Sequence, residues 1–318
     1  MELAKQNMLD LCGNNQTIDT SKYINLPISK DIFTELNLKE LSNLSEMIVE
    51  PKVMGIFEDE KHYLDTLELV LNSTNETSNR LAFFKNIITP SVSKKEHVLD
   101  VGPGDYALTK IVIPEFKNLT VVDENEYILN NSGLALPGHI KINKILGGIE
   151  SVNLKKELYD LVVMSHILYY VDSKNWMNVV KNAYHSLQSN GMLVIVLGGD
   201  ELQKADLIKH FGGETLQINT LAKQCYDIFG FSNVSLFSSE EVFFANTLKS
   251  MLHISAFMLK DAKITAKKDD LIQYIENNLK VGKSDYRMTT RQKYIVIKKG
   301  QFIRSDMDMI NGVETTAV

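Results

Sequence analysis

The stretch HVLDVGPGDY, residues 97–106, constrains the fold of this chain more than any other feature. A short apolar run ends here in two glycines, Gly102 and Gly104, with one residue between them. In a strand–loop–helix unit, glycines let the backbone pass close to a ligand, and the free N–H groups of the following helix face that ligand. The stretch therefore predicts a cofactor-binding loop between a strand and a helix.

A regular alternation of strands and helices follows the glycine loop. The predicted strands are HVLDVG, LTVVDE, YDLVVMS and MLVIVLGG, and helical segments separate them. Such alternation is typical of a parallel sheet covered by helices, which is the α/β class. In the helix before the last of these strands, one face carries apolar residues, and we expect Gly191 to end that helix. A further strand, two helices between residues 243 and 280, and a last strand, QKYIVIKK, are expected to follow.

The pattern predicts a core with helical additions on either side. An amphipathic helix is expected from residue 32 to 44, and two helices are expected before the glycine loop. The predicted organisation is a weakly ordered extension (1–28), a helical segment over the acceptor (29–90), the cofactor-binding core (91–242), a helical insertion (243–290), the final strand (291–299) and a tail (300–318).

The composition excludes several functions. The formal net charge of -6 and the pI of about 5.7 leave no basic field for nucleic acid. No apolar run reaches the roughly 18 residues that a membrane span needs, and the N-terminus lacks the apolar block of a signal peptide, so a cytoplasmic protein is expected. Cys12 and Cys225 lack metal-ligand spacing, and we expect two reduced thiols and no metal.

Asp123 strengthens the case for a cofactor. It ends the second strand about 20 residues after Gly102, near the spacing at which an acid binds ribose hydroxyls. The loop lacks the third glycine of a dinucleotide site and the lysine of a P-loop. The structural alternative is a tight turn at the glycines and a solvated acid at a strand end.

At these residues the sequence resembles class I S-adenosylmethionine-dependent methyltransferases. VLDVGPGDY resembles their first motif, Asp123 their ribose-binding acid, and YDLVVMSHILYYV their fourth strand. The resemblance implies a Rossmann-like sheet of seven strands with the last one antiparallel, and S-adenosyl-L-methionine as the cofactor.

A narrower resemblance is to histamine N-methyltransferase and its relatives. It rests on YLDTLELVLNSTNETSN (63–79), LYYVDS and the terminal YIVIKK. It implies that Glu76 receives the substrate amine and that a pair of tyrosines walls the active site. The positions implied are Tyr169 (catalytic), Tyr170 (substrate-binding), and Tyr63, Gly102, Gly104, Asp123, Glu150 and Ser165 (cofactor-binding).

Departures from that family alter the predicted acceptor site. His166 replaces a glutamine that lies beside the substrate, Thr290 falls near a substrate-binding asparagine, and the tryptophans after the fifth strand have no counterpart. His166 could orient the substrate or relay a proton, whereas the alternative is a histidine bonded to a nearby carbonyl. For Glu76 the alternative is an exposed helix acid. The resemblance therefore implies an amine anchor but not histamine.

The expected function is methyl transfer to a nitrogen of a small molecule. A sulfonium methyl group is already activated, so the protein has to align a nucleophile and exclude water. The alternatives are a protein or peptide N-methyltransferase, a small-molecule O-methyltransferase, and a non-catalytic module that binds S-adenosylmethionine.

Overall fold

The computed structural model describes residues 69–300, apart from 105, 131–137, 139, 262–263 and 265. The predicted extension (1–28), the helix predicted from 32 to 44, Tyr63 and the tail (301–318) lie outside the described residues.

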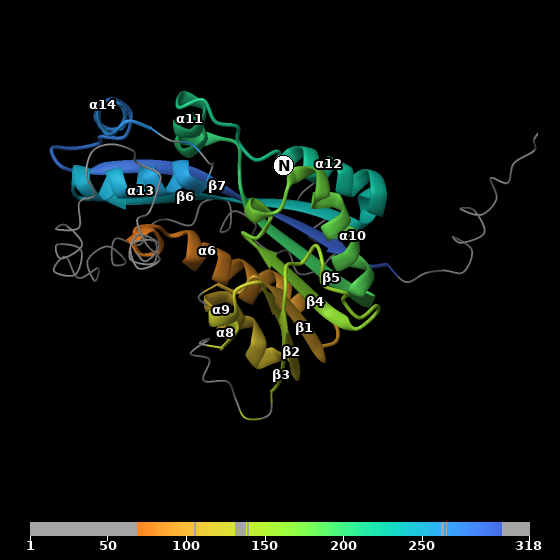
Figure 1. The fold of residues 1–318 in the computed structure, drawn as a ribbon. Helices are drawn as coiled ribbons and strands as arrows, with labels where there is room; N and C mark the ends of the chain where they lie inside the picture. Colours follow the sequence, from red (N-terminus) through yellow and green to blue (C-terminus); the bar gives the residue numbers. More distant parts are fainter. Residues whose placement is uncertain are drawn as a thin grey trace, which may run out of the picture.

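One seven-stranded sheet forms the centre of the described chain (Figure 1). The strand order is β3-β2-β1-β4-β5-β7-β6, and β7 runs antiparallel to both strands beside it, β5 and β6. The strands are β1 (His97–Val101), β2 (Asn118–Asp123), β3 (Lys141–Leu146), β4 (Tyr159–Ser165), β5 (Leu187–Gly198), β6 (Val234–Ala245) and β7 (Tyr286–Lys298). This arrangement confirms the predicted fold class, including the antiparallel last strand.

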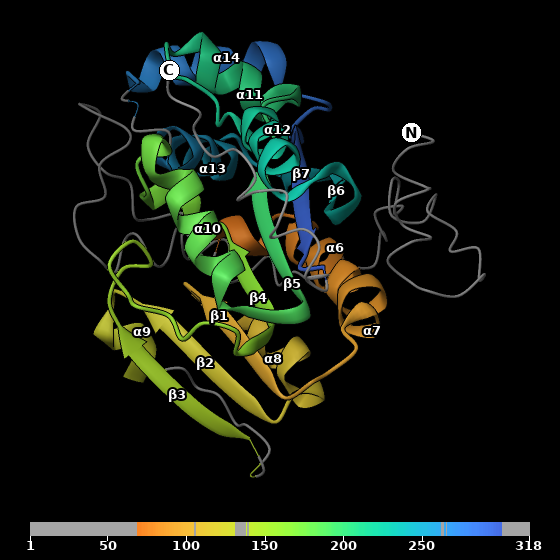
Figure 2. The same ribbon diagram turned by 90° about the vertical axis from the view of Figure 1, so that its right-hand side faces the viewer.

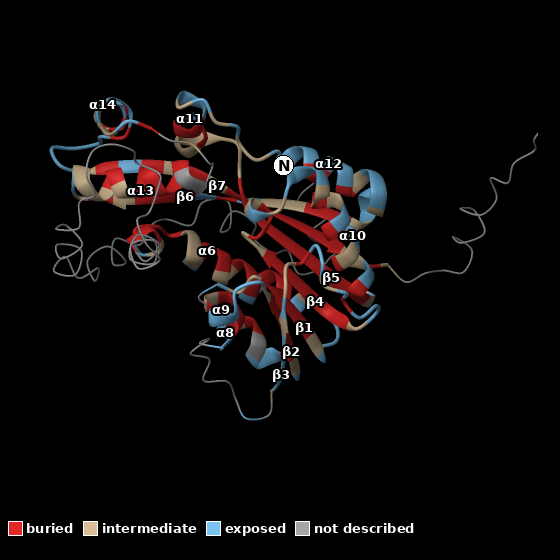
Figure 3. Cartoon of the chain, viewed as in Figure 1, coloured by how far each residue is buried: buried red, intermediate tan, exposed pale blue. Residues whose placement is uncertain are grey.

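The central strands are covered on both faces. Nearly every residue of β1 and β4 is buried, whereas the edge strand β3 is mostly exposed (Figure 3). Continuous apolar runs are what a parallel strand between two helical layers requires. This explains why β1 and β4 could be predicted from the sequence.

Helices form a layer on each face of the sheet (Figures 1 and 2). On one face α10 and α12 pack against β1, β4 and β5, and on the other α6 and α8 do so. The helices are α6 (Glu76–Phe83), α7 (Thr89–Ser91), α8 (Ala107–Val112), α9 (Glu126–Asn130), α10 (Trp176–Ser186), α11 (Leu202–His210), α12 (Ile218–Phe229), α13 (Leu248–Asp261) and α14 (Lys268–Asn278).

The pair β6–β7 extends beyond the rest of the sheet. β5 pairs with β7 only as far as Gly198 and Gln292, while β6 and β7 remain paired to Ala245 and Tyr286. A separate apolar cluster, contributed by α11, α13, α14 and this extension, lies here. The extension thus carries the two helices predicted between residues 243 and 280.

Two local predictions were wrong. The last strand begins at Tyr286, not at residue 291, because β7 continues along β6 past the end of β5. Gly191 does not end α10, which stops at Ser186; it lies within β5, beside an irregularity in the pairing with β4. A Cβ at Gly191 would meet the carbonyl oxygen of Tyr159 at 2.8 Å, so close strand packing explains this glycine.

Candidate active site

The glycine loop joins β1 to α8 at the carboxyl ends of the strands. Gly102 and Gly104 have φ angles of 64° and 56°, in the left-handed region that favours glycine. The N–H of Gly102 donates to the carbonyl of Val122 in β2 (2.8 Å). A Cβ at Gly102 would lie 2.3 Å from Ile167 Cγ2, so this glycine allows the loop after β4 to approach.

Gly104 has a different surrounding from Gly102. A Cβ built there would meet nothing within 4 Å. The backbone at Gly104 therefore borders open space, as a loop that receives a cofactor requires. Tyr106, also at positive φ (59°), anchors the end of the loop through its buried hydroxyl, which donates to the carbonyl of Ile128 (3.1 Å).

Asp123 ends β2 beside this loop. Its Oδ1 accepts the N–H of Asn125 (2.8 Å), and partial burial raises the pKa of the carboxyl. Glu150 follows β3 and is exposed, with Oε1 accepting from Asn175 Nδ2 (3.0 Å). Both acids thus lie beyond the strand ends where a nucleoside is expected.

The end of β4 carries a strained histidine. His166 follows Ser165 and has a φ of 59°, which is uncommon for a residue with a side chain. Its N–H donates to the carbonyl of Val196 in β5 (2.9 Å), and Nδ1 lies 3.3 Å from the hydroxyl of Tyr169. The two rings are stacked, and the Tyr169 hydroxyl also accepts the N–H of Gly198 (2.7 Å). The imidazole is therefore held in one orientation.

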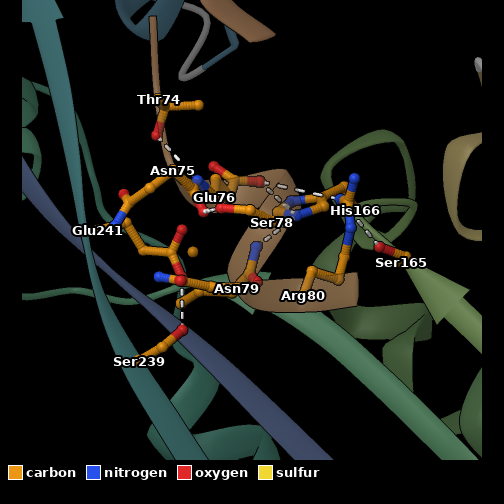
Figure 4. A network of polar contacts seen from close by, with 12 residues as sticks. Thr74, Asn75, Glu76, Ser78, Asn79, Arg80, Ser165, His166, Ser239 and Glu241 are labelled. Atoms are coloured by element: carbon orange, nitrogen blue, oxygen red, sulfur yellow. Dashed lines mark hydrogen bonds and ion pairs between the residues drawn. The ribbon is translucent and has the colours of Figure 1, made fainter. Parts of the chain in front are cut away.

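Glu76 approaches His166 from α6, as Figure 4 shows. Its Oε1 lies 2.8 Å from His166 Nε2 and 3.9 Å from Arg80 Nη1, one turn along the helix. The segment before α6 is bonded along the outer edge of β6: Val242 N–H donates to Asn75 Oδ1 (2.9 Å). This edge contact fixes the start of α6 and directs Glu76 toward the sheet.

The charges around Glu76 determine its ionisation. Burial alone would raise its pKa, but His166, Arg80 and Lys204 more than offset this and lower the pKa to about 2. Burial lowers the pKa of His166, against the opposing effect of Glu76. We therefore describe the pair as a carboxylate beside a neutral imidazole.

A second carboxyl, Glu241 on β6, lies behind this pair. It is 0% exposed and accepts hydrogen bonds on Oε1 from Ser239 Oγ and from Asn79 Nδ2 (3.4 Å). Its Oε2 has no partner in the described part of the chain. Burial and the nearby charge of Glu76 raise its pKa to about 8, so Glu241 is protonated at neutral pH.

Hydrogen bonds connect Glu241 to His166 across β6 and β7. Ser239 Oγ lies 3.2 Å from the hydroxyl of Tyr294, which bonds to Gln292 Oε1 (2.5 Å), and the Gln292 amide lies 2.9 Å from His166 Nε2. Together with α6, which carries Glu76 and Asn79, four elements thus contribute to one polar network.

The structure brings some of the predicted residues together and separates others. Glu76, His166 and Tyr169 are in direct contact, and Arg80 lies within 3.9 Å of both Glu76 and Ser165. Thr290 is buried opposite Glu241 in the β6–β7 pairing, and its hydroxyl has no partner among the described residues. Tyr170, in contrast, is 70% exposed.

The sequence reasoning missed Arg80, Glu241 and Gln292. Alternation along β6 places Ser239, Glu241 and Phe243 on one face, and a carboxyl on the same face as a phenylalanine indicates a buried acid. No comparable pattern distinguishes Arg80 or Gln292, because both acquire their neighbours from other elements.

The described residues contain neither a cluster of metal ligands nor a membrane-spanning helix. They contain no group of three or more histidine, cysteine, aspartate or glutamate side chains placed to hold a metal ion. None of the helices described has the length and apolar character needed to cross a membrane.

Comparison with known proteins gives the class. Residues 99–195 match the methyltransferase domain family. A candidate methyltransferase from Bacillus halodurans C-125 has the same fold, with 16% identity and a TM-score of 0.52 over 71% of this chain and 100% of its own. A SAM-dependent methyltransferase from Archaeoglobus fulgidus is less similar, with 17% identity and a TM-score of 0.43 over 70% of this chain and 94% of its own. The plantazolicin methyltransferase BpumL, solved in complex with SAH, has 12% identity and a TM-score of 0.44 over 85% of this chain and 100% of its own.

Within this fold, residues 99–195 form a methyltransferase domain, and the glycine loop lies inside it. S-adenosyl-L-methionine, which the resemblance of the glycine loop implies, is the cofactor we expect. A search of curated proteins found no match, so the narrower resemblance to histamine N-methyltransferase rests on the sequence motifs alone.

Proposed function

We propose that this enzyme methylates a nitrogen of a small molecule. The observation that carries the proposal is Glu76: an ionised carboxylate on α6 whose Oε1 lies 2.8 Å from His166 Nε2. A carboxylate held on one oxygen can receive an amine or ammonium on the other.

The residues around Glu76 suit the handling of a nitrogen. When bound, the cofactor supplies an activated methyl group, and the attacking nitrogen needs a free lone pair. With a pKa of about 2, Glu76 binds a cation or a hydrogen-bond donor but is a poor proton acceptor. His166, a neutral imidazole, is the better group to take up a proton, and Tyr169 holds it in position.

The remaining site residues are proposed in supporting roles. Thr290 and Tyr170 contact the acceptor, with the segments 29–90 and 243–290 closing over it. The proposed cofactor contacts are Tyr63, Gly102, Gly104, Asp123, Glu150 and Ser165.

A transfer assay tests the acceptor class. The protein is incubated with cofactor labelled in the methyl group and with panels of small amines, hydroxyl compounds and peptides. We expect label on a small amine; label only on peptides or oxygen would overturn the proposal, as would cofactor binding without any transfer.

Glu76→Gln tests the amine anchor once an acceptor is found. The substitution keeps the shape and removes the charge, so kcat/KM for a cationic acceptor should fall by about 2 kcal/mol, which is tens-fold. Cofactor affinity should stay unchanged, and Glu240→Gln, at a more exposed acid on β6, serves as the matched control. Equal losses for a cationic acceptor and its uncharged analogue would exclude the role.

A further inference from the structure

Arg80 is a buried cation whose hydrogen-bonding capacity is largely unused. The residue is 8% exposed, and its Nε has no partner in the described part of the chain. Nη1 makes one long hydrogen bond, to Ser165 Oγ (3.4 Å), and lies 3.9 Å from Glu76 Oε1. A guanidinium has five N–H donors, and a buried charge without a close partner is costly.

Glu76 is an anion near this guanidinium, but it makes no close hydrogen bond to it. Its Oε1 is 2.8 Å from His166 Nε2, more than 1 Å closer than to Arg80. The other carboxyl of the network, Glu241, has a pKa raised to about 8 by burial and by Glu76, and is uncharged at neutral pH. Lys204 adds a second cation near the pair. Arg80 therefore has one carboxylate at 3.9 Å, and its Nε still lacks a partner among the described residues.

The position of Arg80 indicates where a closer anionic partner would come from. Ser165 ends β4, which pairs with β1 up to Val101 and Met164, directly before the glycine loop. α6 also packs against α8, and Phe83 and Phe84 share a cluster with Tyr106 at the end of that loop. Arg80 thus reaches the strand ends at the point where the strand order reverses, between β1 and β4. Figure 4 shows Arg80 on α6 together with Ser165 and His166.

The parts of the cofactor are expected in a fixed order along the carboxyl ends of the strands. Its ribose is expected at Asp123 on β2, with adenine toward β3, so its amino-acid end extends past the glycine loop toward β4. That end carries a carboxylate, and a guanidinium fork matches a carboxylate in both charge and geometry.

We propose that Arg80 binds the carboxylate at the methionine end of S-adenosylmethionine. Arg80 then links the two ligands, because the same side chain lies one helical turn from Glu76, the proposed acceptor anchor. The assignment of Arg80 does not depend on the identity of the acceptor.

Two ligands that differ only in the carboxylate test this directly. Binding of S-adenosylhomocysteine and of its decarboxylated analogue is measured by calorimetry, without acceptor, for the wild type, Arg80→Met and Arg80→Lys. In the wild type the analogue should bind about ten- to hundred-fold more weakly. In Arg80→Met, the affinity for S-adenosylhomocysteine should fall by a similar factor, and the affinity for the analogue should hardly change. Arg80→Lys should recover part of the lost affinity for S-adenosylhomocysteine.

Lys204→Met is the matched control. It removes a cation that acts on the same Glu76–His166 pair and should leave the ratio between the two ligands as in the wild type. Circular dichroism establishes whether each variant is folded. If Arg80→Met does not fold, the two ligands are compared in Arg80→Lys instead.

Either of two results overturns the proposal. One is an equal loss for both ligands in Arg80→Met. The other is no discrimination by the wild type, which would assign Arg80 to an acid group of the acceptor instead. A failure of the proposed N-methylation leaves these binding constants unaffected, so the two failures are distinguishable.

Discussion

The two halves of the candidate site are built in different ways. The cofactor half, at the ends of β1 and β2, consists of a backbone turn and a strand-end acid that lie close together in the sequence. The acceptor half joins side chains of α6, β4, β6 and β7 in a buried polar network. The first half depends on local backbone geometry, and the second depends on the packing of distant elements.

The two glutamates of the acceptor half extend this contrast. Glu76 is held as an anion by cations and a histidine, whereas Glu241 is held neutral by burial. One network therefore contains an ionised carboxylate that can bind a ligand and a carboxyl group that stays protonated.

The largest expected effect is a loss of cofactor affinity when the glycine loop is altered. Gly104→Val places a branched side chain at a positive φ, in space that is open in the structure. We expect cofactor affinity to fall by about 3 kcal/mol or more, measured by calorimetry.

Gly212→Val is the control for that substitution. Gly212 also has a positive φ (83°) and no atom within 4 Å of a built Cβ, but it follows α11, away from the loop. Gly212→Val should lower the stability of the protein about as much as Gly104→Val does, and it should leave the cofactor affinity unchanged. Equal affinity losses in both variants would show that strain, not contact with the cofactor, explains the effect.

A second prediction sharpens the contrast between the glutamates. In the unfolded chain Glu241 ionises near its ordinary pKa of 4.5, but in the folded protein only near 8, so ionisation opposes folding as the pH rises through that window. Glu241→Gln removes this effect. Relative to the wild type it should gain about 3 kcal/mol of unfolding free energy at pH 7 and gain none from this source well below pH 4.5.

Denaturant titrations across this pH range measure the difference. Glu240→Gln, at the neighbouring and partly exposed position, is the control for the substitution itself. A difference for Glu241→Gln that does not vary with pH would contradict a neutral buried carboxyl.

The smallest expected effect returns to the cofactor half. Asp123→Ala removes a partly buried acid at the ribose position, and cofactor affinity should fall by about 1 to 2 kcal/mol with the fold intact. Calorimetry gives the value, and Glu126→Ala, at an exposed acid in the first turn of α9, is the control. Unchanged affinity in Asp123→Ala would remove this residue from the site.

Sequence patterns were sufficient where neighbours in space are also neighbours in the chain. The buried strands β1 and β4 appear as apolar runs, and the glycine loop shows its conformation by its composition. The start of β7 at Tyr286 was not predictable, because those residues are ordered as strand only by pairing with β6. Gly191 was misread for the same reason, since its closest contact is the Tyr159 backbone of another strand.

The sequence by itself determined the α/β class and the order of strands and helices around the glycine loop, and it predicted that this loop binds a cofactor. These follow from hydrophobic periodicity and turn chemistry, which act over a few residues. Only the tertiary structure decided that Glu76 meets His166, that Arg80 reaches Ser165 and that Glu241 is neutral. Burial and the charges of distant elements set those contacts and ionisation states, and neither is written in the local sequence.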